Sequence, residues 1–258
     1  MMELYQHFRK EEQPFIDQVL QWRDNVLTKF TPQLTDFLNP REQLIFQSLI
    51  GNHDELQWGV YGGAEQAERK RVYLAPFYEE IHNSDFHVTL LEATYPSKFV
   101  TLEHRDVLGA FMSLGIKRGK LGDLIVTNNR IQILVASEIA SYVIMNLTGI
   151  KQAGIQLEEK DMTALLSSEE EWEESSGTVS SLRLDAILKE MYQISRQKAS
   201  DYIQKGYVKV NFRMVEDPAF TLQEKDIISL RSKGRSQLQT IEGKTKKDKW
   251  RIITAKLK

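Results

Sequence analysis

The chain has 258 residues and a formal net charge of −2 at pH 7, a size that suggests two or three small domains. It contains no cysteine, which excludes a disulfide framework and a thiolate metal site. No apolar run approaches the ~20 residues that a membrane span needs, and the amino-terminal residues lack the apolar core of a targeting signal. We therefore expect a cytoplasmic protein.

The near-neutral total hides an uneven distribution of charge. Residues 181–258 contain 18 Lys and Arg against 9 Asp and Glu, whereas residues 1–180 contain 16 against 27. The two parts therefore carry +9 and −11. Such a division favours a carboxyl-terminal part that binds a polyanion, rather than a protein that binds non-specifically along its whole length.

The first predicted domain, residues 1–75, combines helices with a strand. Apolar residues recur at helical spacing over residues 15–26 and predict an amphipathic helix. Asn39 suits the N-cap of a second helix, in which Pro40 takes the first position. Residues 72–75 are typical of a strand.

The second predicted domain, residues 76–166, has the order β-α-β-β-α-β. The expected elements are strands at 86–93, 123–127, 130–136 and 154–158, and helices at 104–114 and 137–147. This order implies a four-stranded antiparallel sheet with two helices on one face, the ferredoxin-like arrangement of the RRM. The strand at 130–136 lacks the aromatic rings with which an RRM stacks bases, so we do not expect the usual RRM mechanism.

Besides the basic carboxyl-terminal part, these two domains contain two clusters of cations, which we treat as a candidate second RNA surface. One lies in the glycine-rich loop 115–122, where backbone and cations can both approach phosphates. The other precedes the strand at 72–75. For the loop, the alternative interpretation is that its glycines serve only the turns. For the other cluster, the alternative is a solvated basic surface. The candidate residues are Lys117, Arg118, Lys120, Arg69 and Arg71.

Residues 167–180 are acidic and rich in serine, and we interpret them as a linker. The third predicted domain, residues 181–258, begins with two helices whose N-caps are expected at Ser181 and Ser195. Strands follow at 208–210 and 228–230. Further along, residues 240–241 and 250–253 are expected to pair as a hairpin.

Cations gather around the second of these helices and the strands after it. Arg196 and Lys198 lie in the first helical turn, where free N–H groups and the helix dipole already favour an anion. The other candidates are Lys205, Lys209, Arg231, Lys233 and Arg235. A solvated basic face is the alternative interpretation.

The pattern R-L-D followed by S-R-x-x-A-x-x-x-I-x-x-G-x-V-x-V-N resembles the S4 domain, in which two helices and a strand hold structured RNA. The resemblance implies that Asp185 orients a neighbouring arginine. Phe212 departs from the family, because glycine normally follows Asn211 in a tight turn. The implied RNA contacts are Arg183, Ser195, Arg196, Lys198, Lys205, Lys209, Asn211 and Arg235.

Three further segments are F-L-N-P-R-E-Q, Y-G-G-A-E-Q-A-E-R-K-R and L-E-H-R-D-V-L-G-A-F-M-S-L-G-I-K-R-G-K-L-G-D. With these segments and the S4 domain, the whole chain resembles the YlmH proteins of Gram-positive bacteria and cyanobacteria. Those proteins are non-enzymatic RNA binders encoded near cell-division genes. The resemblance implies a role on the large ribosomal subunit, in quality control of stalled peptidyl-tRNA, with ribosomal RNA, tRNA or both as ligands. The expected fold is α+β, with a small amino-terminal domain, an RRM-like middle domain and a carboxyl-terminal S4 domain.

An RNA-modifying enzyme and a scaffold for division proteins are the rival classes. R-L-D at 183–185 mimics a pseudouridine synthase loop, but its flanking residues are absent, and no glycine-rich turn suits a methyltransferase cofactor. The five histidines show no metal-ligand spacing. We therefore expect no catalytic residue, no cofactor and no metal ion, and we expect a monomer.

Overall fold

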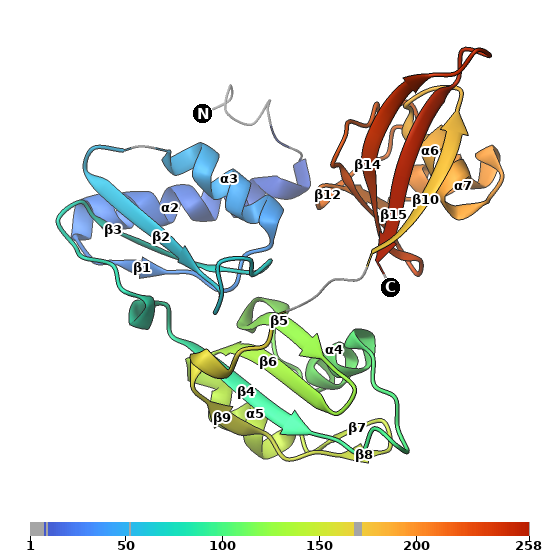
Figure 1. Cartoon of the computed structure of the whole chain (residues 1–258). Coiled ribbons are helices and arrows are strands. Elements are labelled where there is room, and N and C mark those ends of the chain that lie inside the picture. The colour runs from blue at the N-terminus through green and yellow to red at the C-terminus, as the bar shows by residue number, and fades with distance from the viewer. Residues whose placement is uncertain (1–7, 9, 52, 168–171, 258) are drawn as a thin grey trace. The chain divides into compact units, whose positions relative to one another are not determined.

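The computed structural model describes residues 8, 10–51, 53–167 and 172–257 (Figure 1). The chain divides into two compact units, residues 1–168 and 169–258. Helices and strands occur in both units, which confirms the predicted α+β class. Within the described ranges, no helix has the length and apolar character needed to cross a bilayer.

The amino-terminal part of the first unit builds one core from helices and a three-stranded sheet. Its elements are α2 (Gln13–Lys29), β1 (Gln33–Leu34), α3 (Pro40–Ile50), β2 (Leu56–Tyr61) and β3 (Arg71–Pro76), preceded by a 3-10 turn at Lys10–Glu12. The antiparallel strand order is β1-β3-β2. Val19 of α2, Phe46 of α3 and Leu74 of β3 lie in this core. Strands β1 and β2 were not predicted.

Helix α3 begins as its sequence predicts. The side-chain oxygen of Asn39 accepts hydrogen bonds from the backbone N–H groups of Arg41 and Glu42, at 2.9 and 3.0 Å. The Glu42 carboxylate in turn accepts from the Asn39 N–H at 2.7 Å. Pro40 occupies the first turn, where its missing N–H costs nothing.

The rest of the first unit forms a four-stranded antiparallel sheet in the order β5-β6-β4-β9. Its main elements are β4 (Val88–Thr94), α4 (His104–Ser113), β5 (Leu121–Val126), β6 (Arg130–Ala136), α5 (Ala140–Asn146) and β9 (Glu158–Lys160). Short 3-10 turns lie at Asn83–Phe86, Arg118–Lys120, Ser137–Ile139 and Met162–Ala164. The last strand was predicted at 154–158. A small hairpin, β7 (Gly149–Ile150) with β8 (Ala153–Gly154), precedes it and delays the strand.

The second unit is a six-stranded antiparallel sheet with two helices. Its elements are β10 (Trp172–Val179), α6 (Leu184–Tyr192), α7 (Arg196–Gln204), β11 (Val208–Val210), β12 (Arg213–Met214), β13 (Ile227–Leu230), β14 (Gly234–Lys244) and β15 (Trp250–Leu257). The strand order is β10-β15-β14-β13-β11-β12. Both helices and the strands β11, β13 and β14 contribute to one hydrophobic core. The predicted hairpin is present, since Ile241 pairs with Ile252.

The linker predicted at 167–180 requires a correction. Residues 172–179 form strand β10, which pairs along its full length with β15, from Trp172 with Leu257 to Val179 with Trp250. Its Glu and Ser residues are mostly exposed, as suits an edge strand, while Val179 is buried. The rest of the predicted linker, apart from Ser167 and Ser180, lies outside the described residues.

Of the two N-caps predicted in this unit, the structure confirms one and contradicts the other. Ser195 caps α7, because its hydroxyl accepts a hydrogen bond from the Lys198 N–H at 3.2 Å. Ser181 does not cap α6, which begins at Leu184 with Arg183 at the cap position. The Leu184 N–H donates instead to the carbonyl of Phe220, so a distant loop satisfies the start of the helix.

Candidate RNA-binding site

A buried carboxylate holds two arginines at the start of the helix pair. Asp185 is only 3% exposed. It accepts hydrogen bonds from Nε and Nη2 of Arg183, both at 3.1 Å, and from Nε of Arg196 at 2.9 Å. Burial opposes ionisation of Asp185, but the two arginines outweigh it and lower the pKa of this carboxyl below its usual value. The arginine side chains themselves are 41% and 51% exposed, so they can also meet an anion.

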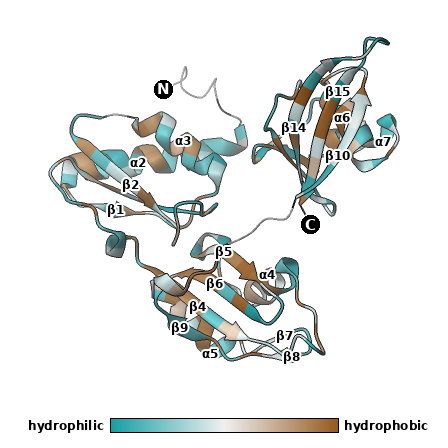
Figure 2. Cartoon of the chain, in the orientation of Figure 1, coloured by the Kyte–Doolittle hydropathy of each residue, from teal (hydrophilic) through white to brown (hydrophobic). Residues whose placement is uncertain are grey.

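Helix α7 carries the next cation and leads to a pair of tyrosines. The helix is coloured mainly as hydrophilic in Figure 2. Lys198 is exposed, and its ammonium lies 5.8 Å from the ring centroid of Tyr202, one turn further along. The Tyr202 ring lies 6.3 Å from that of Tyr207, which immediately precedes β11. The guanidinium of Arg231 lies over the Tyr207 ring at 5.2 Å.

The strands place a row of polar residues on the face away from the core. Val208, Val210 and their partners on β13 are buried, so the alternate residues point outward. Lys209 pairs with Ser229, and Ser229 pairs with Arg235 on the next strand. Tyr207 and Arg231 continue this outward face at one end. The printed ring contacts thus link Lys198, through Tyr202 and Tyr207, to Arg231. We use the name cationic surface for the candidate residues Arg183, Arg196, Lys198, Lys209, Arg231 and Arg235.

Three other predicted contacts have different placements. Lys205 is exposed at the C-terminal end of α7, two turns from Lys198. Lys233 is exposed in the turn before β14. The Asn211 side chain serves the turn between β11 and β12. Its amide donates to Asp226 at 2.7 Å, and its oxygen accepts from the Ile227 N–H at 2.9 Å.

The aromatic partners of these cations were not predicted as part of the site. Tyr202, Tyr207 and Phe212 each lie beneath a cation of the cationic surface, and Arg235 lies 5.6 Å from the Phe212 centroid. The spacing of Lys198 and Tyr202, four residues apart on a helix, was a signal available in the sequence. The other two pairs join different strands and depend on their register.

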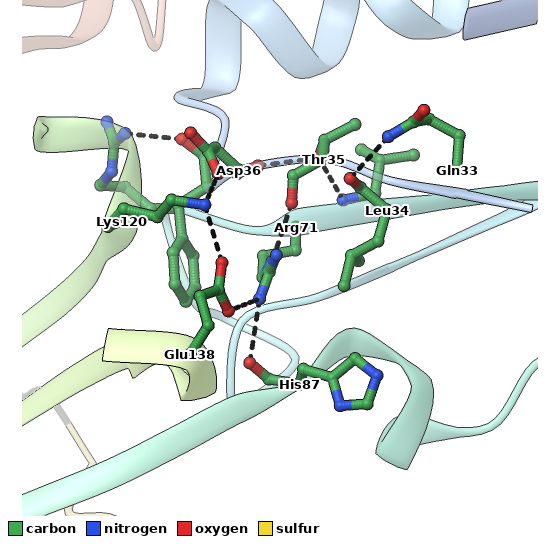
Figure 3. Close-up of polar contacts among 11 residues, drawn as sticks. Gln33, Leu34, Thr35, Asp36, Arg71, His87, Lys120 and Glu138 are labelled. Carbon is green, nitrogen blue, oxygen red and sulfur yellow. Dashed lines mark hydrogen bonds and ion pairs between the residues drawn. The ribbon is translucent and has the colours of Figure 1, made fainter. Parts of the chain in front are cut away.

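The expected second RNA surface is not favoured by the structure, because most of its cations bind acceptors within the chain. Figure 3 shows this for Arg71 and Lys120. Arg71 is only 3% exposed and donates to the carbonyls of Thr35 and His87 and to Glu138. Lys120 forms ion pairs of 2.5 and 2.7 Å with Asp36 and Glu138. These contacts join the β3 sheet to the β4 sheet within the first unit.

Two further arginines of that expected surface also have internal partners. Arg69 donates to the carbonyls of Leu121 and Phe37, and Arg118 donates to that of Leu121. Burial, followed by the nearby charge of Arg69, lowers the pKa of Arg118 to about 10. Lys117 is exposed. The four partnered residues are buried or half-buried, so less of each is open to a phosphate than at Arg183 and Arg196.

The face of the β4 sheet opposite helices α4 and α5 is also covered by the chain itself. Gln132 of β6 is 1% exposed, and it exchanges hydrogen bonds of 2.8 Å with the carbonyl of Ala164 and the N–H of Leu166. Gly63 packs closely against Leu134, the next residue on this face, since a Cβ added at Gly63 would come within 2.9 Å of the Leu134 side chain. An RRM binds bases on the corresponding face, whereas here other parts of the chain pack against Gln132 and Leu134.

Metal chemistry finds no support in the described part of the chain, where no group of three or more His, Asp or Glu side chains is arranged to hold an ion. Asp185, the acid of the R-L-D segment, is engaged by two arginines. The arrangement as a whole can hold phosphates and stack bases.

Comparison with known families agrees with this geometry. Residues 182–228 match the S4 domain model, residues 11–79 match "YlmH, N-terminal", and residues 82–164 match "Putative RNA-binding domain in YlmH". The class is therefore that of multidomain RNA-binding proteins with a carboxyl-terminal S4 domain. The chain belongs to the YlmH family, which confirms the resemblance.

Two relatives support this membership. The chain is 43% identical over 252 residues, covering 98% of both sequences, to the Bacillus subtilis (strain 168) protein named "Ribosome-associated protein quality control protein P2". A solved structure, "Cell division protein ylmH from Streptococcus pneumoniae", is similar with a TM-score of 0.55 and 32% identity. The similarity covers 63% of this chain and 99% of that one.

Proposed function

We propose that this protein is a non-enzymatic RNA-binding protein of the large ribosomal subunit, active in quality control of stalled peptidyl-tRNA. Its cationic surface would hold structured ribosomal RNA, tRNA or both. The name of the Bacillus subtilis relative supports the cellular role. The observation that best supports an RNA contact is the buried carboxylate of Asp185, which orients Arg183 and Arg196 beside the start of α7.

The physical basis of this contact is electrostatic. The start of α7 offers backbone N–H groups and the positive end of a helix dipole, and Lys198 adds an exposed charge. Lys209 and Arg235 extend the positive potential across β11 and β14. Phosphate contacts of this kind supply most of the affinity for nucleic acid and fix its orientation.

The test is charge reversal at exposed cations that make no contact with Asp185. Lys198→Glu combined with Lys209→Glu should weaken co-sedimentation with large ribosomal subunits at least about tenfold, since two phosphate contacts become repulsive. Lys29→Glu combined with Lys98→Glu changes the net charge equally at exposed positions of the first unit and should leave binding unaltered. Both variants should keep the wild-type unfolding midpoint. Equal losses in the two variants, or none in either, would contradict the proposed site.

The non-enzymatic part of the proposal has a separate test. RNA incubated with the purified protein should keep its nucleoside composition, measured after complete digestion. A new modified nucleoside that depends on Asp185 would assign catalysis instead, because that residue occupies the position that mimics a synthase loop.

A further inference from the structure

The turn between β11 and β12 holds an aromatic residue in a backbone conformation that favours glycine. Val210 pairs with Arg213, which leaves Asn211 and Phe212 as a two-residue turn. Their φ angles are 47° and 65°. Asparagine tolerates such angles, but a bulky side chain at positive φ is an outlier that destabilises the fold. Glycine at position 212 would relieve that strain.

Hydrogen bonds keep this turn from relaxing. The Asn211 N–H donates to the Ile227 carbonyl at 2.8 Å, and the Asn211 side chain bonds Asp226 and the Ile227 N–H. The second oxygen of Asp226 accepts from the Gln223 N–H at 2.8 Å. Strain that the surroundings hold in place is characteristic of functional positions.

The ring of Phe212 stands beside the cationic surface. The guanidinium carbon of Arg235 lies 5.6 Å from the ring centroid, and Arg235 belongs to the outward row with Lys209. Phe212 is only half-buried, so part of the residue meets solvent. Arg213, the next residue, is exposed. A partly exposed aromatic ring beside a cation is a combination with which proteins bind unpaired nucleotides, through base stacking and phosphate contact together.

We propose that Phe212 is a stacking platform for one unpaired base, while Arg235 contacts the phosphate of that nucleotide. The inference rests on the proposed RNA-binding function and narrows its ligand to a paired stem that adjoins an unpaired base. A perfectly paired stem would engage the cations but leave the ring unused. The strain at position 212 is then the cost of holding this ring in place.

The experiment uses the full chain and two RNA hairpins that share one stem, of which only one carries a single bulged 2-aminopurine. The wild-type protein should prefer the bulged hairpin at least about fivefold, the lower end of what stacking on one aromatic ring provides. Binding should also quench the 2-aminopurine fluorescence. Phe212→Trp should retain both effects.

Two variants separate stacking from a packing role. Phe212→Gly should raise the urea midpoint, because the turn loses its strain, yet abolish the preference for the bulged hairpin. Phe212→Leu should keep the midpoint near that of the wild type and lose the preference as well. Affinity for the paired hairpin should stay within about twofold in both variants, because the phosphate contacts remain.

The possible outcomes are distinct. If Phe212→Gly binds the bulged hairpin with wild-type preference, or if the wild-type protein shows no preference, the stacking inference is overturned while the proposed function stands. If the wild-type protein binds neither hairpin, even at low salt, the proposed function and the inference both fail.

Discussion

At the scale of single residues, Asp185 determines how the arginine pair is presented. A buried carboxylate is costly unless it is paired, and here three hydrogen bonds from Arg183 and Arg196 compensate for burial. The hydrogen bonds hold two flexible side chains in place without any ligand. At the proposed RNA contact this order would reduce the entropy lost on binding.

Replacing the carboxyl group of Asp185 should lower the free energy of unfolding by an amount that depends on pH. Asp185→Asn should lower the free energy of unfolding near neutral pH by about 2 kcal/mol, because charge-assisted hydrogen bonds are lost. The pKa of Asp185 is lowered in the folded state. The carboxylate therefore contributes its full stabilisation above the unfolded pKa of about 3.9, and this stabilisation disappears as the pH falls through the folded pKa. Urea unfolding of both proteins across this pH range measures the difference. Asp248→Asn, at an exposed site, is the control, and a difference that persists unchanged in strong acid would contradict the account.

Sequence alone predicted part of the candidate site. The Ser195 cap was recognised because it depends on its own helix, and the orienting role of Asp185 followed from the S4 pattern. Asn211 was predicted to contact RNA, and its side chain also bonds Asp226 and Ile227. Local spacing could not show these partners, because they lie 15 and 16 residues away. The Phe212–Arg235 contact depends on strand register and could not be read from local spacing.

At the scale of elements, local signals predicted helices better than short strands. Periodicity located α2, α4 and α7, because an amphipathic helix carries its pattern within itself. Strand β10 was interpreted as a linker, because its stability comes from pairing with β15, some eighty residues away. A Cβ at Gly177 in β10 would lie 2.7 Å from the Glu190 carboxylate of α6, so that side chain would have to move.

A glycine in α4 provides a prediction at this scale. Gly109 lies at an exposed position inside the helix, and a Cβ added there would meet no atom within 4 Å. Gly109→Ala should therefore raise the free energy of unfolding by about 0.5–1 kcal/mol, through helix propensity. Gly122→Ala is the contrasting variant, because its Cβ would lie 2.8 Å from the Phe37 ring and should destabilise. Thermal unfolding measures both, and a loss of stability in Gly109→Ala would show that the helix needs this glycine.

At the scale of the molecule, the first unit is held together by the cations that the sequence offered as a second RNA surface. Arg71 and Lys120 converge on Glu138, and Arg71 also bonds the carbonyls of Thr35 and His87. A cluster of basic residues has the same composition whether it faces solvent or a neighbouring domain. Composition therefore located these charges without revealing their partners.

This assignment predicts a separation between stability and RNA binding. Arg71→Ala should lower the free energy of unfolding by about 2–4 kcal/mol, because buried carbonyls lose their donor. It should leave the RNA affinity of the folded protein unaltered, since the cationic surface lies in the second unit. Arg105→Ala, at an exposed ion pair, should cost less than about 0.5 kcal/mol. Chemical unfolding and RNA titration test the two parts, and a stable Arg71→Ala variant with impaired RNA binding would reverse the assignment.

The central claim is that RNA is held by α7 and the strands that follow it. The most direct measurement is ultraviolet crosslinking of the full chain to large ribosomal subunits, followed by identification of the crosslinked peptides. The account predicts crosslinks within residues 183–235, above all at the aromatic rings of Tyr202, Tyr207 and Phe212. Crosslinks confined to residues 82–164 would contradict it.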